Sequence, residues 1–201
     1  MKCLRCRATL VVGALVTALL GSAGLTGCQA AEPVAASKGV KPMKIEVKST
    51  AFAQGQAIPK KYTGEGVDVS PPITWSGVPE GTKEIALICD DPDAPVAEPW
   101  VHWVIYNIPA DTAGLPEGVP RTNRLAKPAG AVQGKNSWPS NNIGYRGPMP
   151  PPGHGTHHYH FRVYALDTHL AVEPGLDKKG LVREIKPHIL EEGVLTGTYE
   201  R

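Results

Sequence analysis

The sequence predicts a mainly β domain, a β-sandwich with short peripheral and C-terminal helices. Five short apolar runs typical of strands follow one another after residue 43. Turn-forming residues separate these runs, because the chain contains 20 prolines and 22 glycines. Helix signals occur only near the C-terminus. Many strands followed by one late helical segment favour a sandwich-like domain with helices at its periphery.

The predicted strands cover residues 44–49, 73–75, 84–89, 101–106 and 158–166. The last is the clearest, because apolar residues occupy every second position from Tyr159 to Ala165. Near the C-terminus, Asp177 is expected to cap a short helix. One face of that helix carries Leu181, Val182 and Ile185. Pro187 is expected to begin a further helical turn that ends at Gly193.

The first 27 residues predict export from the cytoplasm. Three basic residues precede an apolar run at residues 10–20, and small residues then lead to Cys28. A cationic start, an apolar core and a small-residue cleavage site make a secretory signal peptide. The ending Leu-Thr-Gly-Cys resembles the lipobox of bacterial lipoproteins, in which the cysteine receives a diacylglyceryl group and becomes the new N-terminus. The alternative is an uncleaved transmembrane anchor, because residues 10–27 could nearly span a bilayer.

This interpretation divides the chain into three segments. Residues 1–27 form the signal peptide, residues 28–43 a flexible tether lipidated at Cys28, and residues 44–201 one domain. The tether has an r.m.s. reach of roughly 20 Å if it behaves as a loose coil. We expect a protein of the cell envelope, held on the periplasmic face of a membrane or on the cell surface by its lipid.

Composition excludes some classes of partner. Removal of the signal leaves 18 basic and 19 acidic residues, a formal charge of −1. The processed chain therefore lacks the excess of positive charge that indicates nucleic-acid binding. Cys89 lies in an apolar run and is expected to be a buried, inert thiol.

Two short clusters place polar side chains at the ends of predicted strands. Asp91 and Asp93 follow an apolar strand, in a turn that alternate prolines make rigid. Trp100 and His102 share one face of the next strand, and Trp103 is expected on the other face. Each cluster also has a plain structural interpretation. The aspartates fit a solvated turn, and a histidine beside a tryptophan fits ordinary packing.

A third cluster lies in residues 144–159, where a Gly/Pro-rich loop leads directly into the last strand. It belongs to an almost aperiodic stretch, residues 110–157, and such long loops in compact domains are usually functional. Four of the seven histidines fall between positions 154 and 160, which suggests a metal site. His157 and His158 point to opposite faces of a strand, however, and no HExxH or Cys-Xaa-Xaa-Cys spacing occurs. We therefore expect no metal and no cofactor.

Three motifs stand in order along the chain: Asp91-Pro-Asp-Ala-Pro95, Trp100-Val-His-Trp103, and Gly147-Pro-Met-Pro-Pro-Pro-Gly153 followed by His157-His-Tyr159. Together they resemble the signature of the phosphatidylethanolamine-binding protein family, in the bacterial branch often called Raf kinase inhibitor-like. The resemblance covers roughly residues 44–201. It implies a large central β-sheet, a smaller sheet packed against it, and short C-terminal helices.

The resemblance also implies a small pocket that holds anions such as phosphate, acetate or a phospholipid headgroup. Its implied ligand-binding residues are Asp91, Asp93, Trp100, His102, His157 and Tyr159, with backbone from the loop between Gly147 and Pro151. Imidazole and phenol groups can donate hydrogen bonds to phosphate oxygens. We expect one aspartate to orient and charge His102 or His157, and the other to be protonated or to face away. Phosphate binding would then weaken above about pH 6.5, where an unperturbed histidine loses its proton.

The leading functional hypothesis is an exported, lipid-anchored binding protein for an anionic small molecule or a phospholipid headgroup. Regulation of an unidentified partner protein is compatible with it. Two alternatives stay open: an acid–base hydrolase that uses the Asp and His groups, and a docking module like the protease inhibitors of the family. No Gly-Xaa-Ser-Xaa-Gly motif occurs. We therefore assign no catalytic residue and favour binding over catalysis.

Overall fold

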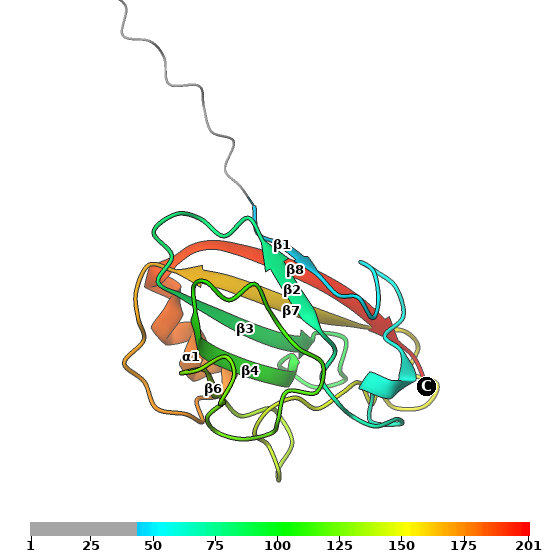
Figure 1. Cartoon of the computed structure of the whole chain (residues 1–201). Coiled ribbons are helices and arrows are strands. Elements are labelled where there is room, and N and C mark those ends of the chain that lie inside the picture. The colour runs from blue at the N-terminus through cyan, green and yellow to red at the C-terminus, as the bar shows by residue number, and fades with distance from the viewer. Residues whose placement is uncertain (1–43) are drawn as a thin grey trace, which may run out of the picture. The chain divides into compact units, whose positions relative to one another are not determined.

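The computed structural model describes residues 44–201, which form two antiparallel β-sheets and one short α-helix (Figure 1). The larger sheet has the strand order β6-β4-β3-β7-β8: β6 (Val132–Gln133), β4 (Trp100–Pro109), β3 (Glu84–Asp91), β7 (His157–Leu166) and β8 (Ile189–Tyr199). The smaller sheet has the order β1-β2-β5: β1 (Glu46–Lys48), β2 (Ile73–Ser76) and β5 (Gly114–Leu115). The predicted mainly β fold with a large and a smaller sheet is confirmed.

The predicted signal peptide, the tether and the lipidation site Cys28 lie outside the described residues. Within residues 44–201, no helix combines the length and the apolar character that crossing a membrane requires.

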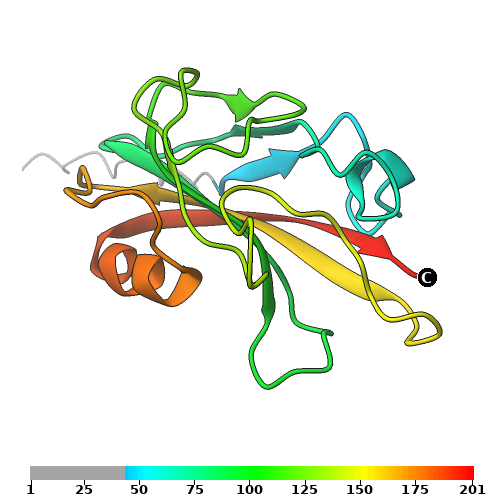
Figure 2. The same cartoon turned by 90° about the horizontal axis from the view of Figure 1, so that it is seen from below.

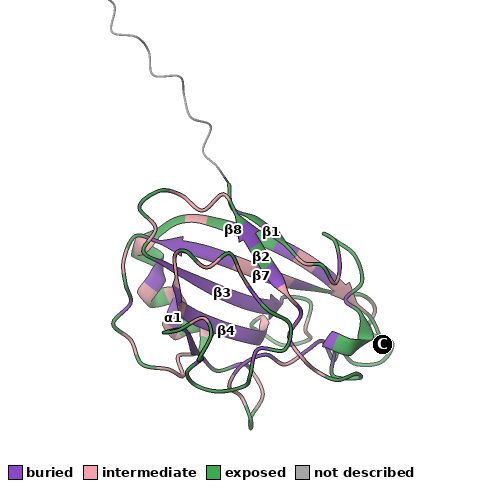
Figure 3. Cartoon of the chain, viewed as in Figure 1, coloured by how far each residue is buried: buried purple, intermediate pink, exposed green. Residues whose placement is uncertain are grey.

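Strand β3 lies at the centre of the larger sheet, and all eight of its residues are buried (Figure 3). One face of the sheet packs against the smaller sheet, and the other is covered by α1 (Lys178–Ile185) and neighbouring loops (Figure 2). A strand buried on both faces has a nearly continuous apolar sequence, as residues 85–89 do. Cys89 belongs to this run. Burial raises the pKa of its thiol well above the ordinary value, so the expected buried thiol is confirmed.

Alternate side chains of strand β7 point into two separate cores, one on each face of the larger sheet. Tyr159, Phe161 and Val163 lie in the core between the sheets, whereas Tyr164 and Leu166 lie in the core under α1. The predicted period-two strand is therefore confirmed, and its inner face leads directly toward the candidate site.

Helix α1 forms as the sequence predicts. The Asp177 side chain accepts a hydrogen bond of 2.7 Å from the backbone N–H of Gly180, which caps the first turn. Leu181 and Ile185 are buried against the larger sheet. Burying side chains of this size stabilises the fold by about 1.5–3 kcal/mol each.

The region after α1 differs from the prediction. The prediction of a helical turn from Pro187 to Gly193 is wrong for most of its length. A single short turn, η2 (Lys186–His188), forms there, and the edge strand β8 begins at Ile189. Two of its inward positions are glycines. A Cβ on Gly193 would lie 2.3 Å from the carbonyl oxygen of Ile45, and one on Gly197 would lie 2.5 Å from a side-chain carbon of Ile58. These close contacts require glycine, which removes the apolar alternation that identifies a strand.

Three short elements fall in segments for which the sequence predicts no regular structure. They are the 3₁₀ turn η1 (Lys60–Tyr62) and the two-residue strands β5 and β6. The last two interrupt residues 110–156, which otherwise contain no helix or strand.

Candidate functional site

Three strands of the larger sheet bring the polar motifs together at one end. Asp91, the last residue of β3, pairs with Trp100 at the start of β4. On the other side of β3, Asp90 pairs with His160 of β7. Motifs far apart in the sequence therefore meet where β3 ends and where β4 and β7 begin.

A β-bulge in β4 positions His102. Cys89 of β3 pairs with Trp103, but the next residue of β3 pairs two positions back along β4, at Val101, so His102 is the extra residue. Bulges re-aim side chains. His102 contacts Tyr159 with ring centroids 5.0 Å apart, and Trp103 belongs to the same core cluster as Tyr159. The prediction that Trp103 points to the opposite face from His102 is wrong, because the bulge interrupts regular alternation.

The ring of His102 is buried and is bonded through one nitrogen only. Its Nδ1 lies 2.6 Å from the carbonyl oxygen of Arg146; a carbonyl only accepts, so Nδ1 carries the proton. Burial lowers the pKa of His102 to about 4, despite the opposing effects of this bond and of nearby aspartates. Its Nε2 is buried without a partner. At neutral pH His102 is therefore uncharged, and its Nε2 can only accept a hydrogen bond. This contradicts the expectation that His102 donates to phosphate.

Asp91 orients His157. Its Oδ2 accepts a hydrogen bond of 2.7 Å from His157 Nδ1, and both side chains are buried. Its Oδ1 accepts a bond of 2.9 Å from the backbone N–H of Asp93. The second nitrogen of His157, Nε2, lies 2.8 Å from Nδ1 of His154. The imidazole of His157 thus links a buried carboxylate to the exposed residue His154.

Six of the eight predicted pocket residues line one cavity of about 240 Å³. This is the volume of roughly eight water molecules, below the range of about 300–1,000 Å³ that is usual for drug-sized ligands. The cavity therefore suits a small chemical group. Its lining residues are Asp91, Ala94, Pro95, Val96, Trp100, His102, Trp138, Met149, Pro150, Pro151, His157 and Tyr159.

Tyr159, which also lines this cavity, carries a second unpartnered polar atom. Its hydroxyl is buried without a hydrogen-bond partner. Burial raises the pKa of Tyr159 far above its ordinary value, so the hydroxyl stays protonated. Of the four such side-chain atoms in residues 44–201, only Tyr159 Oη and His102 Nε2 belong to residues that line this cavity. Buried polar atoms are normally satisfied, so the pair indicates a site for a ligand.

Asp93 is a predicted site residue that does not line the cavity. Its Oδ2 accepts hydrogen bonds from the backbone N–H and from Nδ1 of His158, at 2.8 and 2.7 Å. Burial acts to raise the pKa of Asp93, but the bonds from His158 outweigh it and lower the pKa below its ordinary value. Asp93 is thus turned away from the cavity and paired on the surface.

Gly147 is the other predicted residue outside the cavity lining. Its N–H donates a hydrogen bond of 2.7 Å to Asp68 Oδ1 and so is not free for a ligand. A Cβ at this position would lie 2.2 Å from the carbonyl oxygen of Tyr62. Glycine is needed here for close backbone packing, which corrects its assignment to ligand binding.

Trp138 also lines the cavity, although no sequence motif predicted it. Its ring centroid lies 5.4 Å from that of Trp100 and 5.1 Å from that of His102, both edge to face. The guanidinium of Arg146 lies 4.9 Å from the same ring. The signal in the sequence is a lone tryptophan in a polar loop, where no strand periodicity marks it.

The charges around the cavity are few. No lysine or arginine is among its lining residues, and Asp91 is the one carboxylate. In the part of the chain that the structure describes, no group of three or more His, Cys, Asp or Glu residues is arranged to hold a metal ion.

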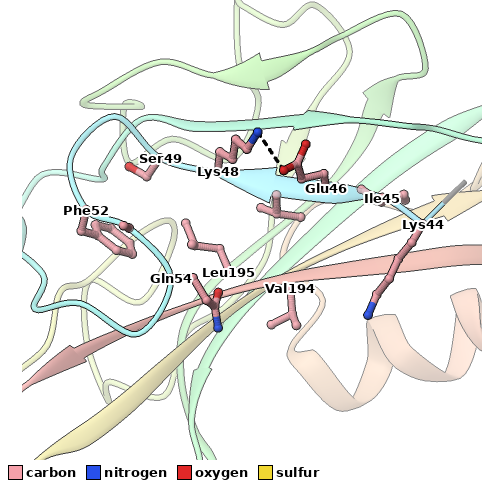
Figure 4. A pocket seen from close by; sticks show the side chains of 11 residues that line it. Lys44, Ile45, Glu46, Lys48, Ser49, Phe52, Gln54, Val194 and Leu195 are labelled. Carbon is pink, nitrogen blue, oxygen red and sulfur yellow. Dashed lines mark ion pairs between the residues drawn. The ribbon is translucent and has the colours of Figure 1, made fainter.

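A larger and more exposed cavity of about 620 Å³ lies between β1 and β8 (Figure 4). Its polar contacts include an exposed ion pair of 2.7 Å between Lys48 and Glu46. None of its lining residues carries one of the buried unpartnered atoms found in residues 44–201. It therefore gives no comparable indication of a ligand.

A two-sheet β domain with a small, partly polar cavity at its strand ends defines a class of ligand-binding β-sandwich. This chain belongs to the phosphatidylethanolamine-binding protein family, whose model matches residues 48–200. The resemblance inferred from the three motifs is confirmed.

Relatives and solved structures agree with this assignment. A UPF0098 protein of Methanothermobacter thermautotrophicus is 50% identical over 157 residues, which cover 78% of this chain and 99% of the relative. A UPF0098 protein of Pyrococcus horikoshii is 45% identical over 163 residues, covering 81% and 80%. The structure of E. coli YbcL, described as a member of the mammalian PEBP family, has a TM-score of 0.72 at 35% identity and covers 79% of this chain and 99% of YbcL. A putative PEBP homologue from Chlamydia trachomatis has a TM-score of 0.69 at 38% identity, covering 79% and 99%.

Proposed function

We propose that this protein is a lipid-anchored binding protein of the cell envelope, with a cavity for a small phosphate-bearing group. The group is either a free anion or part of a phospholipid headgroup. The observation that carries the proposal is the pair of unpartnered atoms, Tyr159 Oη and His102 Nε2, in residues that line one cavity. A phenol can donate to an anionic oxygen, and hydrogen bonds to charged groups contribute about 1.5–3 kcal/mol.

The contacts around His157 favour binding over hydrolysis. Asp91 and His157 have the geometry of an oriented base. His157 Nε2 is engaged by His154, however, and the residues that line the cavity include no Ser, Thr, Cys or Lys nucleophile. A ligand bound beside Asp91 and His157 therefore meets no serine, threonine, cysteine or lysine nucleophile.

Replacing Tyr159 with phenylalanine is expected to weaken phosphate-ester binding about 10- to 100-fold, because the variant loses the hydroxyl donor but keeps the ring. Titration calorimetry of the mature protein in detergent with monomethyl phosphate measures the effect. Tyr164→Phe is the matched control, since Tyr164 is buried in the other core and does not line the cavity. Equal affinity for wild type and Tyr159→Phe would contradict the proposed site.

Replacing Cys28 with serine is expected to move the protein from the membrane to the soluble fraction. The physical reason is loss of the only lipid attachment point that the sequence predicts, since the processed chain has a formal charge of −1 and no electrostatic attraction to anionic lipids. Fractionation of cells that express each version, followed by immunoblotting, measures the distribution. A Cys28→Ser protein that stays with the membrane would rule out anchoring through this cysteine.

A further inference from the structure

We infer that residues 40–43, the last four residues of the predicted tether, form an additional edge strand that pairs with the free part of β8 and covers the groove between β1 and β8. The inference is independent of the proposed ligand cavity, which lies at the other end of β8, where Tyr199 pairs with His157. It follows from an edge that the domain covers only in part, and from the place where the N-terminal segment meets that edge.

The second half of β8 is covered along its outer edge by residues 54–58, which run parallel to it. The carbonyl oxygen of Thr196 accepts a hydrogen bond of 2.7 Å from the N–H of Gly55. The carbonyl oxygen of Thr198 accepts one of 2.8 Å from the N–H of Ile58. The backbone groups of these two β8 residues therefore point outward, away from β7.

The first half of β8 has the same outward-facing groups but no neighbouring strand. Backbone direction alternates along a strand, so Glu192 and Val194 face the same edge as the covered residues. Within residues 44–201, no segment pairs with this edge at either position, and the N–H of Glu192 donates only to the side chain of Glu191, at 3.1 Å. Unpaired backbone groups at an edge are a template for a further strand. We call residues 190–194 the free edge.

The side chains of the free edge are apolar and acidic. Leu190 and Val194 are two of the six large hydrophobic side chains that are exposed in the described part of the chain. Glu191 and Glu192 add two carboxylates. Glu192 lies 4.0 Å from Arg162, whereas Glu191 forms no ion pair with any described residue. A segment that fits this edge therefore carries apolar residues and a basic one.

The N-terminal segment of the domain crosses β8 next to the free edge and runs in the same direction as β8. A Cβ on Gly193 would lie 2.3 Å from the carbonyl oxygen of Ile45. Further along the strand, a Cβ on Gly197 would lie 2.7 Å from the ring of Phe52. Continued backward from Ile45, this course leads along the free edge, so residues 40–43 are the part of the chain best placed to occupy it.

Residues 40–43 also have the composition that the free edge requires. They read Val-Lys-Pro-Met, with two apolar residues, one basic residue and a proline. An edge strand accepts proline where its nitrogen faces solvent. Pro42 therefore fixes the alternation, and the N–H groups of Lys41 and Met43 point toward β8. In this arrangement Lys41 lies near Glu191, which has no basic partner among the described residues.

Two other occupants of the free edge are disfavoured. A second copy that paired β8 with β8 would set Glu191 and Glu192 of two molecules opposite one another, and like charges destabilise a ladder. A separate partner has to compete with a segment that the chain itself holds nearby, because Lys44, the next residue, already lines the groove (Figure 4). A short covalent link corresponds to an effective concentration on the order of millimolar.

Amide hydrogen exchange of the mature protein in detergent, measured residue by residue by NMR, tests the inference. The amides of Lys41, Met43 and Val194 are expected to exchange about tenfold or more slowly than in an unstructured chain, because each donates a hydrogen bond between the two strands. The amide of Val40 points to solvent and is expected to exchange freely.

Free exchange at Lys41 and Met43 would overturn the inference. Protection of Val194 without protection of these two amides would overturn it as well. Such protection would assign the free edge to a second copy if dilution of the protein removed it, and to a different molecule if dilution did not. None of these results bears on the ligand cavity, so the proposed function stands or falls separately.

A matched pair of proline substitutions tests the direction of the hydrogen bonds. Met43→Pro removes an N–H that points toward β8, so the protection of Lys41 and Val194 is expected to fall about tenfold. Val40→Pro is the control, because the N–H that it removes points to solvent, and protection is expected to be unchanged. Slow exchange of the buried β3 amides shows that each variant is folded. Equal effects of the two substitutions, or no effect of either, would contradict the pairing.

Charge reversal tests the placement of Lys41. Lys41→Glu is expected to lower the protection of Val194 about two- to fivefold, because it sets a third carboxylate beside Glu191 and Glu192. Glu191→Lys is expected to have a similar effect, since it faces one lysine with another. The double variant restores the opposite charges and is expected to recover most of the protection. Additive losses in the double variant would show that the two side chains do not meet, and would overturn the proposed arrangement.

Discussion

Replacing Gly147 with alanine is expected to destabilise the domain by about 3 kcal/mol, the upper part of the range for overpacked sites. The new Cβ would lie 2.2 Å from the carbonyl oxygen of Tyr62. That oxygen accepts a hydrogen bond of 2.7 Å from the hydroxyl of buried Tyr145, so it is held in place. Backbone atoms cannot rotate away as a side chain can, and the two segments must therefore separate.

The same substitution is expected to disturb the cavity, because Gly147 follows Arg146, whose carbonyl oxygen holds the ring of His102. Denaturant unfolding monitored by tryptophan fluorescence measures the stability, and calorimetry measures ligand binding. Gly153→Ala is the control from the same loop. Gly153 has a φ of +72°, but a Cβ added there would have no atom within 4 Å, so alanine costs only about 1–2 kcal/mol of backbone strain. Equal stability losses in the two variants would contradict the close approach at Gly147.

Much of the fold was predictable because its central strands have strong sequence patterns. Strand β3 is a continuous apolar run, and β7 alternates with period two. The motifs at the ends of β3, β4 and β7 carry Asp91, Trp100, His157 and Tyr159, so placing these strands side by side also places these residues together. Recognising the strands in the sequence is thus enough to predict that these residues lie close together.

The parts that were not predictable depend on contacts between distant segments. Strand β8 is hidden because Gly193 and Gly197 occupy positions that usually carry apolar side chains. The bulge at His102 comes from a mismatch in pairing between β3 and β4, which neither strand shows by itself. The donor and acceptor roles of His102 depend on the carbonyl oxygen of Arg146, which lies 44 residues further along the chain. Residue types therefore indicated a pocket, but not the direction of its hydrogen bonds.

The buried His102 is expected to make the domain lose stability in mild acid, on the order of 3 kcal/mol between pH 6.5 and pH 4. In the unfolded chain this histidine takes up a proton near pH 6.5. In the folded domain burial keeps it neutral down to a pKa of about 4. Between these values the unfolded state binds more protons, so stability is fully present above pH 6.5 and is lost as the pH falls. Denaturant unfolding at half-unit pH steps measures the slope.

The contribution of His102 is obtained by comparing the pH dependence of stability in wild type and in a His102 variant, because carboxylates also titrate in this range. Buried Glu84, whose pKa burial raises, has an effect of opposite sign that is common to all variants. The His102→Gln variant is expected to lose less stability than wild type over this interval. Parallel slopes for wild type and His102→Gln would mean that the ring is charged in the folded state. Its Nε2 would then be a donor.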